Sequence, residues 1–144
     1  MFDQLRTVSP EPPQKPWSEP SIYPSRSMTS EDLPMVEALH DETFGPGALT
    51  RSAYRVREGQ PSFTPFCRVL FDGDRLIAAI RYTAITIGGQ GDALMLGPLM
   101  VAAGHAGQGH GRRLTSESLK AARDGGIKFV LLVGDAPSYA RFGF

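Results

Sequence analysis

Three apolar stretches in the middle of the chain predict the strands of a sheet. Residues 67–71 and 75–87 are rich in aliphatic and aromatic side chains, and they flank the sequence Asp72-Gly73-Asp74. Asp-Gly is a strong hairpin signal because glycine adopts the positive φ that a tight turn requires. A glycine-rich break at residues 88–92 precedes the third stretch, residues 93–101. The pattern therefore predicts three consecutive antiparallel strands.

Apolar residues at a helical spacing predict helices on both sides of these strands. Thr29 and Ser30, followed by Glu31 and Asp32, are typical of a helix start, because hydroxyl and carboxylate groups complement the first free amides. We expect this helix to end at about Glu42. Further helices are expected over residues 50–58, 112–123 and 136–142, the second of them closed by two glycines at 125 and 126. The expected inward-facing side chains are Leu33, Val36, Leu39, Phe44, Leu114, Leu119 and Ala122.

A short apolar run and a proline complete the predicted sheet. Residues 127–133, IKFVLLV, lie between two helical segments, which is typical of a strand that is covered on both faces and parallel to its neighbour. Pro98 has no amide hydrogen, so its place in the third strand marks an edge or a bulge. With a short strand within residues 21–27, the order strand, two helices, three strands, helix, strand, helix predicts a mixed α/β fold.

Length, charge and cysteine content limit the class of protein. The 144 residues suit one domain over residues 21–144, after a proline-rich leader over residues 1–20 that we expect to be flexible. Fifteen basic residues balance fifteen acidic ones, which argues against a nucleic acid or a membrane surface as partner. The sequence has no apolar run that indicates a membrane span or a secretory signal, so we expect a cytoplasmic protein. Cys67 is the only cysteine, and we expect a buried reduced thiol.

The segment HAGQGHGRRL, residues 105–114, directly follows the third strand and predicts an anion site. A loop between a strand and a helix presents free amides at the positive end of the helix dipole. Glycines at 107, 109 and 111 let the backbone approach a phosphate, and Arg112 and Arg113 add positive charge. The lysine and hydroxyl of a nucleoside triphosphate loop are missing, and the spacing matches the dinucleotide fingerprint poorly. We therefore predict a pyrophosphate site, with a turn that binds nothing as the alternative.

Together with its flanks, this segment resembles the GNAT superfamily of N-acetyltransferases. The resemblance rests on LGPLMV, GQGHGRRL and VLLVGDAPSYARFGF, extends over residues 22–144 and includes FGPGALTRSAYRVREG. It is to bacterial members that end in GDPxYYxRFGF. It implies a GNAT-like fold with a splayed parallel strand pair and acetyl-CoA as cosubstrate. The family signature Q/R-x-x-G-x-G/A falls on residues 106–111, with Ala106 in place of the usual glutamine or arginine, which implies weaker binding of the pyrophosphate.

The resemblance also implies which residues bind and which react. Tyr139 matches the tyrosine of the family's Y-x-x-x-G-F, whose phenol faces the coenzyme sulfur, so it is the expected general acid. The alternative is a packed tyrosine with a satisfied hydroxyl. The reaction implied is direct attack of a primary amine on the thioester, with the oxyanion held by an amide near Leu99 or Met100. Coenzyme binding is implied for Leu99, Met100 and Val101 in the strand and for Ala106, Gly107, Gln108, Gly109, His110, Gly111 and Arg112 in the loop.

Other reactive side chains receive no role from the sequence. Glu37, Asp41 and Glu42 are all candidates for the general base, and nothing in the pattern selects one. His105 and His110 lie in the glycine loop without carboxylates in the same segment, which favours neighbours of the phosphate over metal ligands. We therefore expect no metal.

The end of the chain leaves a second function and a partner open. The sequence stops at Phe144, where the family continues through two further strands, so we expect a fragment, an incomplete protein, or strand exchange in a homodimer. Ala106 and this short end also leave open a catalytically weak acyl-CoA-binding sensor or interaction module with the same fold.

Overall fold

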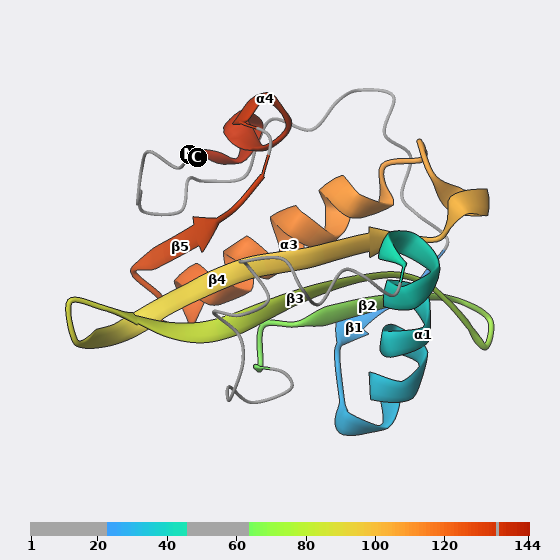
Figure 1. Cartoon of the computed structure of the whole chain (residues 1–144), viewed down its shortest axis with the longest axis horizontal. Coiled ribbons are helices and arrows are strands. Elements are labelled where there is room, and N and C mark those ends of the chain that lie inside the picture. Colours follow the sequence, from blue (N-terminus) through green and yellow to red (C-terminus); the bar gives the residue numbers. More distant parts are fainter. Residues whose placement is uncertain (1–22, 46–63, 135) are drawn as a thin grey trace.

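The computed structural model describes residues 23–45, 64–134 and 136–144. Within them, five strands form one sheet in the order β1-β2-β3-β4-β5 (Figure 1). Neighbours among the first four strands are antiparallel, whereas β5 is parallel to β4. The three consecutive antiparallel strands and the parallel pair predicted from the sequence are thus confirmed. The strands are β1 (Ser25–Ser27), β2 (Arg68–Asp72), β3 (Arg75–Ile87), β4 (Gln90–Val101) and β5 (Phe129–Leu132).

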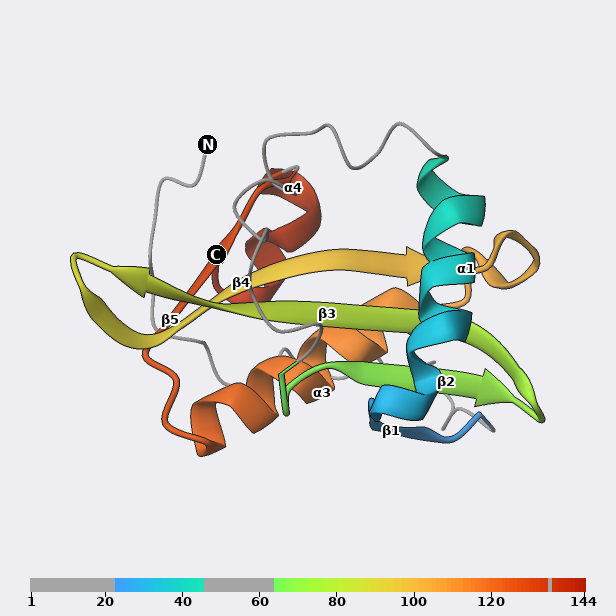
Figure 2. The ribbon, with the colours of Figure 1, turned by 60° about the horizontal axis from the view of Figure 1, so that its bottom comes forward.

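Helices cover both faces of the sheet, as Figure 2 shows. On one face α1 (Leu33–Phe44), which follows the 3-10 turn η1 (Ser30–Asp32), crosses β3 and β4. On the other face α3 (His110–Asp124) packs across β2, β3 and β4. The side chains predicted to face inward from these helices are buried or half-buried in one core. Because β3 is covered from both sides, its residues 76–80 are all buried, which explains their continuous apolar run.

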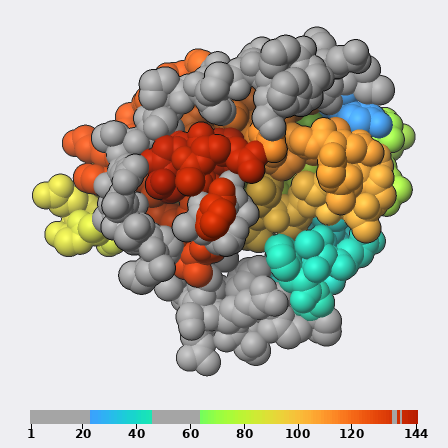
Figure 3. Space-filling model, turned by 90° about the horizontal axis from the view of Figure 1, so that it is seen from above, coloured from blue at the N-terminus to red at the C-terminus, as the bar shows by residue number. Residues whose placement is uncertain are grey.

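The chain closes with α4 (Ala136–Tyr139) and the 3-10 turn η4 (Ala140–Phe142), where the sequence predicts a short helix. In Figure 3 these red residues lie on the same face of the molecule as the orange connection between β4 and α3. None of the helices over the described ranges is long and apolar enough to cross a membrane. The predicted leader over residues 1–20 and the predicted helix over residues 50–58 lie outside the described residues.

The parallel strands β4 and β5 separate at the predicted proline. They pair from Ala93 with Phe129 to Leu96 with Leu132 and no further. Next along β4, a cis peptide bond joins Gly97 to Pro98, and the register against β3 shifts so that this pair of residues opposes the single residue 81. The shift is the bulge that the proline predicts. Beyond it β5 leads away toward α4, which gives the splayed strand pair (Figure 1).

The prediction that residues 127–133 are covered on both faces is wrong. Val130 and Leu132 are buried in the core. Phe129, however, is 36% exposed, and Val133, which directly follows β5, is 64% exposed. One face of this strand is therefore buried, and the other is only partly covered.

The register of the sheet explains this difference. Leu132 lies beside Leu96, and Leu96 beside Tyr82, whose hydroxyl is hydrogen-bonded to Ser118 on α3. Leu132 thus faces α3, and since side chains alternate along a strand, Phe129 faces the opposite side of the sheet. On that side α1 packs on β3 and β4, so the side chain of Phe129 lies beyond its cover.

Candidate functional site

The loop between β4 and α3 has the backbone conformation that its glycines predict. It begins with the 3-10 turn η3 (Ala103–His105). Gly107 and Gly109 have φ angles of +78° and +85°. In this left-handed region a side chain clashes with the following carbonyl, so glycine is the favoured residue. The two turns curl the backbone into the first residue of α3, His110.

This loop presents a row of free backbone amides. The amide of Arg113 donates to the carbonyl of Gly109 at 3.0 Å, which closes the first turn of α3. The amides of residues 107–112 have no acceptor in the part of the chain that the structure describes. Free amides at a helix N-terminus combine with the helix dipole to favour an anion. The geometry therefore has the property that the sequence predicts for a phosphate-binding loop.

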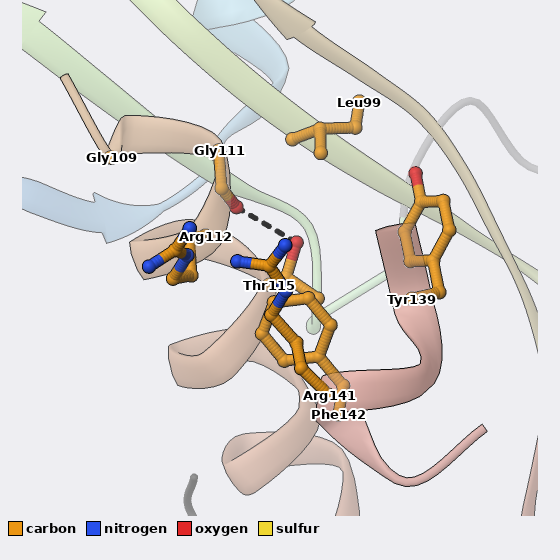
Figure 4. Close-up of a pocket in the computed structure, with 8 residues that line it drawn as sticks. All are labelled: Leu99, Gly109, Gly111, Arg112, Thr115, Tyr139, Arg141 and Phe142. Carbon is orange, nitrogen blue, oxygen red and sulfur yellow. Dashed lines mark hydrogen bonds between the residues drawn. The ribbon is translucent and has the colours of Figure 1, made fainter. Parts of the chain in front are cut away.

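A cavity of about 380 Å³ lies beside these amides. Figure 4 shows its lining, which comes from β4, from the first turns of α3 and from the C-terminal segment of α4 and η4. A Cβ atom at position 111 would lie 3.4 Å from Leu99 Cδ2, which is van der Waals contact, so the first turn of α3 packs directly beside β4. The lining residues are Leu99, Gly109, Gly111, Arg112, Thr115, Tyr139, Arg141 and Phe142.

Tyr139 brings a protonated phenol into this cavity. Its ring is half-buried, and burial raises the pKa of the phenol above its ordinary value near 10, so it keeps its proton at neutral pH. The hydroxyl points toward the side of the cavity formed by Leu99 (Figure 4), and within the described residues it has no hydrogen-bond partner. A Cβ atom at Gly134 would lie 3.1 Å from Tyr139 Cε2, so a side chain there would require the ring to shift by a few tenths of an ångström.

The edge of β4 next to the cavity carries further backbone amides that have no acceptor among the residues described. Ala102 donates its amide to the Ile77 carbonyl on β3 at 2.8 Å. Amides alternate in direction along a strand, so the amide of Met100 also points toward β3. The amides of Leu99 and Val101 therefore point toward the opposite edge of β4. At that edge β5 no longer pairs with β4.

The two loop arginines have different surroundings. Arg112 lines the cavity, as expected. The expectation that Arg113 adds charge there is wrong, because its Nε donates to Glu117 Oε1 at 2.8 Å and its Nη1 donates to the Tyr23 carbonyl at 2.7 Å. Consecutive residues of a helix point about 100° apart, so Arg113 is directed away from Arg112, toward Glu117 and the Tyr23 carbonyl.

The loop histidines face away from the cavity lining. His110 is buried, its Nε2 lies 3.0 Å from Gln108 Oε1, and its ring packs edge-on against Tyr23. Burial, followed by the charges of His105 and Arg113, lowers the pKa of His110. His105 places its Nε2 3.6 Å from an oxygen of Asp72, a carboxylate that is distant in sequence. No cluster of three or more metal-binding side chains occurs among the residues described.

The remaining candidates from the sequence lie elsewhere. Glu37, Asp41 and Glu42 are exposed on α1, and none of them lines the cavity. Cys67 is fully buried, and its Sγ accepts a hydrogen bond from the Tyr82 amide at 3.2 Å, which confirms the predicted core thiol.

Sequence reasoning missed three residues of the cavity. Thr115 lies one helical turn after Gly111 and donates its hydroxyl hydrogen to that residue's carbonyl at 2.8 Å. Because residues four apart share one face of a helix, the spacing could have predicted that Thr115 lies at the same cavity as Gly111. Arg141 and Phe142 follow Tyr139 closely in the same motif. Their contribution depends on how η4 packs against α3, which no local pattern specifies.

The characteristic sequence of the acetyltransferase (GNAT) domain matches residues 24–144. The uncharacterised N-acetyltransferase YhbS of Escherichia coli strain K12 is 29% identical over 117 residues, which are 78% of this chain and 68% of that protein. The crystal structure of E. coli YhbS in complex with CoA has a TM-score of 0.72 and 26% identity, over 88% of this chain and 71% of that chain.

A GNAT family acetyltransferase from Brucella melitensis in complex with acetyl-CoA shares the fold, with a TM-score of 0.68 and 24% identity over 85% of this chain and 82% of that chain. The domain match covers all but the first residues of the sequence and all of the site described above. The chain therefore belongs to the GNAT family of acetyltransferases, the fold and the enzyme class that its sequence predicts.

Proposed function

We propose that this chain transfers the acetyl group of acetyl-CoA to a primary amine by direct attack of the amine on the thioester. One observation carries the proposal: free amides of the glycine loop and the protonated phenol of Tyr139 lie at one cavity. The first is a binding site for a diphosphate and the second is a proton donor, and acetyl transfer from a coenzyme needs both. CoA in the crystal structure of the similar YhbS supports the choice of coenzyme.

The residues present fit acetyl-CoA as cosubstrate. The amides of residues 107–112 and the guanidinium of Arg112 would hold the diphosphate, since glycines at 107, 109 and 111 leave the backbone accessible. The exposed edge of β4 would bind the pantetheine arm through Leu99 and Val101, whose amides point away from β3. The cosubstrate supplies the activated thioester carbonyl.

The chain's own groups would then assist each change of charge. The Leu99 amide, which points away from β3, would donate to the carbonyl oxygen as negative charge develops on it, whereas the Met100 amide is directed toward β3. The amine nitrogen bonds to the carbonyl carbon and releases one proton to water, and the carbon–sulfur bond breaks as the oxyanion returns to a carbonyl, so that the thiolate leaves. Tyr139 gives its phenolic proton to that sulfur, and burial, which keeps the phenol neutral, preserves this proton at physiological pH.

The test is Tyr139→Phe, assayed by release of free thiol from acetyl-CoA with a panel of primary amines. Loss of a general acid lowers kcat by about 10²- to 10⁴-fold. Because phenylalanine keeps the ring that packs on Gly134, we expect the Kd for CoA to stay within about twofold of the wild-type value. An unchanged kcat would remove Tyr139 from the mechanism.

The second function, a catalytically weak acyl-CoA sensor, is favoured by Ala106, which lacks the family's glutamine or arginine side chain. The same assay separates the two functions. If the wild-type chain binds CoA but releases thiol with no amine above the hydrolysis background, the sensor replaces the enzyme. If it does not bind CoA, both functions are excluded.

A further inference from the structure

We propose that Arg141 is a second phosphate-binding residue of this site, which with Arg112 holds the coenzyme's phosphates from two sides. The inference rests on the proposed use of acetyl-CoA. It concerns a residue that the glycine-loop motif does not include, because Arg141 lies on η4, about thirty positions after the loop.

The first observation is the pattern of ion pairs. Five lysine and arginine side chains among the described residues lie within 4.0 Å of a carboxylate, whereas Arg112 and Arg141, like Arg75 away from the cavity, have no such partner in the described part of the chain. The paired residues are Arg26, Arg68, Arg113, Lys120 and Lys128. Arg112 and Arg141 both line the cavity, so their charges are available to a ligand there.

The second observation is the direction of the Arg141 side chain. Figure 4 shows it extending from η4 in the direction of α3, with its guanidinium group on the side of the view where Arg112 lies. Arg112 and Arg141 line one cavity together with Gly109 and Gly111, so two guanidinium groups belong to the cavity at the positive end of the α3 dipole. Like charges at that end are unfavourable unless an anion lies between them, because the helix N-terminus itself attracts negative charge.

The chemistry of the ligand follows from these groups. Guanidinium is planar, permanently charged and suited to two parallel hydrogen bonds with phosphate oxygens. CoA carries two sources of such oxygens, the diphosphate and the 3′-phosphate of the ribose. The amides of residues 107–112 would hold one anion, and Arg141, which lines the same cavity from η4, would add its charge to that site.

The experiment compares binding of CoA and of 3′-dephospho-CoA by isothermal titration calorimetry. The proteins are wild type, Arg141→Gln, Arg141→Lys and the control Arg75→Gln, an exposed arginine that does not line the cavity. Far-UV circular dichroism and the thermal midpoint confirm that each variant folds. Since Arg141 is exposed, its replacement should leave the thermal midpoint unchanged.

We expect Arg141→Gln to raise the Kd for CoA about tenfold, as loss of one charge-assisted hydrogen bond does. Arg141→Lys should recover part of this loss, and Arg75→Gln should bind as wild type does. If Arg141→Gln weakens the binding of both CoA and 3′-dephospho-CoA, Arg141 contacts the diphosphate. If it weakens the binding of CoA alone, Arg141 contacts the 3′-phosphate. If the Kd of Arg141→Gln stays within twofold of the wild-type value for both ligands, the proposal is overturned and the proposed function is left intact. Failure of the wild-type chain to bind CoA overturns both.

Discussion

Single residues decide how closely the backbone of this site approaches a ligand, and two glycines of the loop do so in different ways. Gly109 has a left-handed φ of +85° with open space around it, so its requirement is conformational. Gly111 is helical, and a Cβ atom there would reach only van der Waals contact with Leu99, so the fold itself does not require glycine at this position. A substitution by alanine therefore tests two separate physical effects at positions only two residues apart.

We predict that Gly109→Ala lowers the free energy of unfolding by about 1–2 kcal/mol, the cost of a left-handed L-residue. Gly111→Ala should not destabilise the fold, because its Cβ reaches only van der Waals contact with Leu99 and alanine favours helix over glycine. Urea unfolding at neutral pH measures both values. Equal losses in the two variants would show that the loop conformation is not the one described.

The sequence predicts residues whose requirement is local. The glycines of the loop and the phenol of Tyr139 belong to short motifs, so both could be identified from the sequence alone. The direction of Arg113 toward Glu117, and that of Arg141 toward α3, depend on which groups packing brings near. His105 illustrates the same limit, since its carboxylate neighbour Asp72 is contributed by β2.

At the scale of elements, a buried hydrogen bond fixes α3 on the sheet. Ser118 Oγ lies 2.6 Å from the Leu114 carbonyl, to which it donates its only proton, so the Tyr82 hydroxyl donates to Ser118 Oγ over 2.7 Å. Burial raises the pKa of Tyr82 strongly, which agrees with a neutral donor. The helix that presents the free amides is thereby held at a set position on β3.

We predict that Ser118→Ala destabilises the chain by about 1–3 kcal/mol, because the Tyr82 hydroxyl is left buried without an acceptor. The double variant Ser118→Ala with Tyr82→Phe should recover part of this loss, since it removes both polar groups. Urea unfolding of the two single variants and the double variant gives the coupling energy. Additive losses would show that the two hydroxyl groups act independently.

The strands and helices themselves were largely predictable, because they follow from periodic patterns and turn residues. Asp72-Gly73-Asp74 specified the β2–β3 hairpin, and Pro98 specified the bulge. The exposed face of β5 was not predictable, because an apolar run indicates which side chains favour burial but not whether a layer lies over them.

At the scale of the whole molecule, three elements that are separate in the sequence meet at one cavity. β4 contributes a free edge, α3 contributes amides and α4 contributes the phenol. Because β5 no longer pairs with β4 after Leu96, the edge of β4 beside the cavity keeps its backbone groups accessible. The separation of the two strands therefore creates part of the site. The sequence indicates this arrangement only through its resemblance to a known family.

Global stability should depend on pH through His110, a buried group at the start of α3. Its pKa lies below that of the imidazole in the unfolded chain, about 6.5, so between these values the unfolded chain binds more protons. The free energy of unfolding must then fall as the pH decreases through 6.5. The groups around the ring are Gln108, Tyr23, His105 and Arg113, and none of them is a carboxylate that would offset the effect.

We therefore predict that wild type loses more stability than His110→Gln between pH 7.5 and pH 5.5, because glutamine removes the titrating ring and keeps a polar group beside Gln108. Urea midpoints of both proteins at the two pH values, in buffers of equal ionic strength, measure the difference. Parallel losses would mean that the ring takes up its proton equally well in the folded and the unfolded chain. The imidazole at the start of α3 would then be solvated to the same extent in the folded and the unfolded chain, and its burial would contribute nothing to the pH dependence of stability.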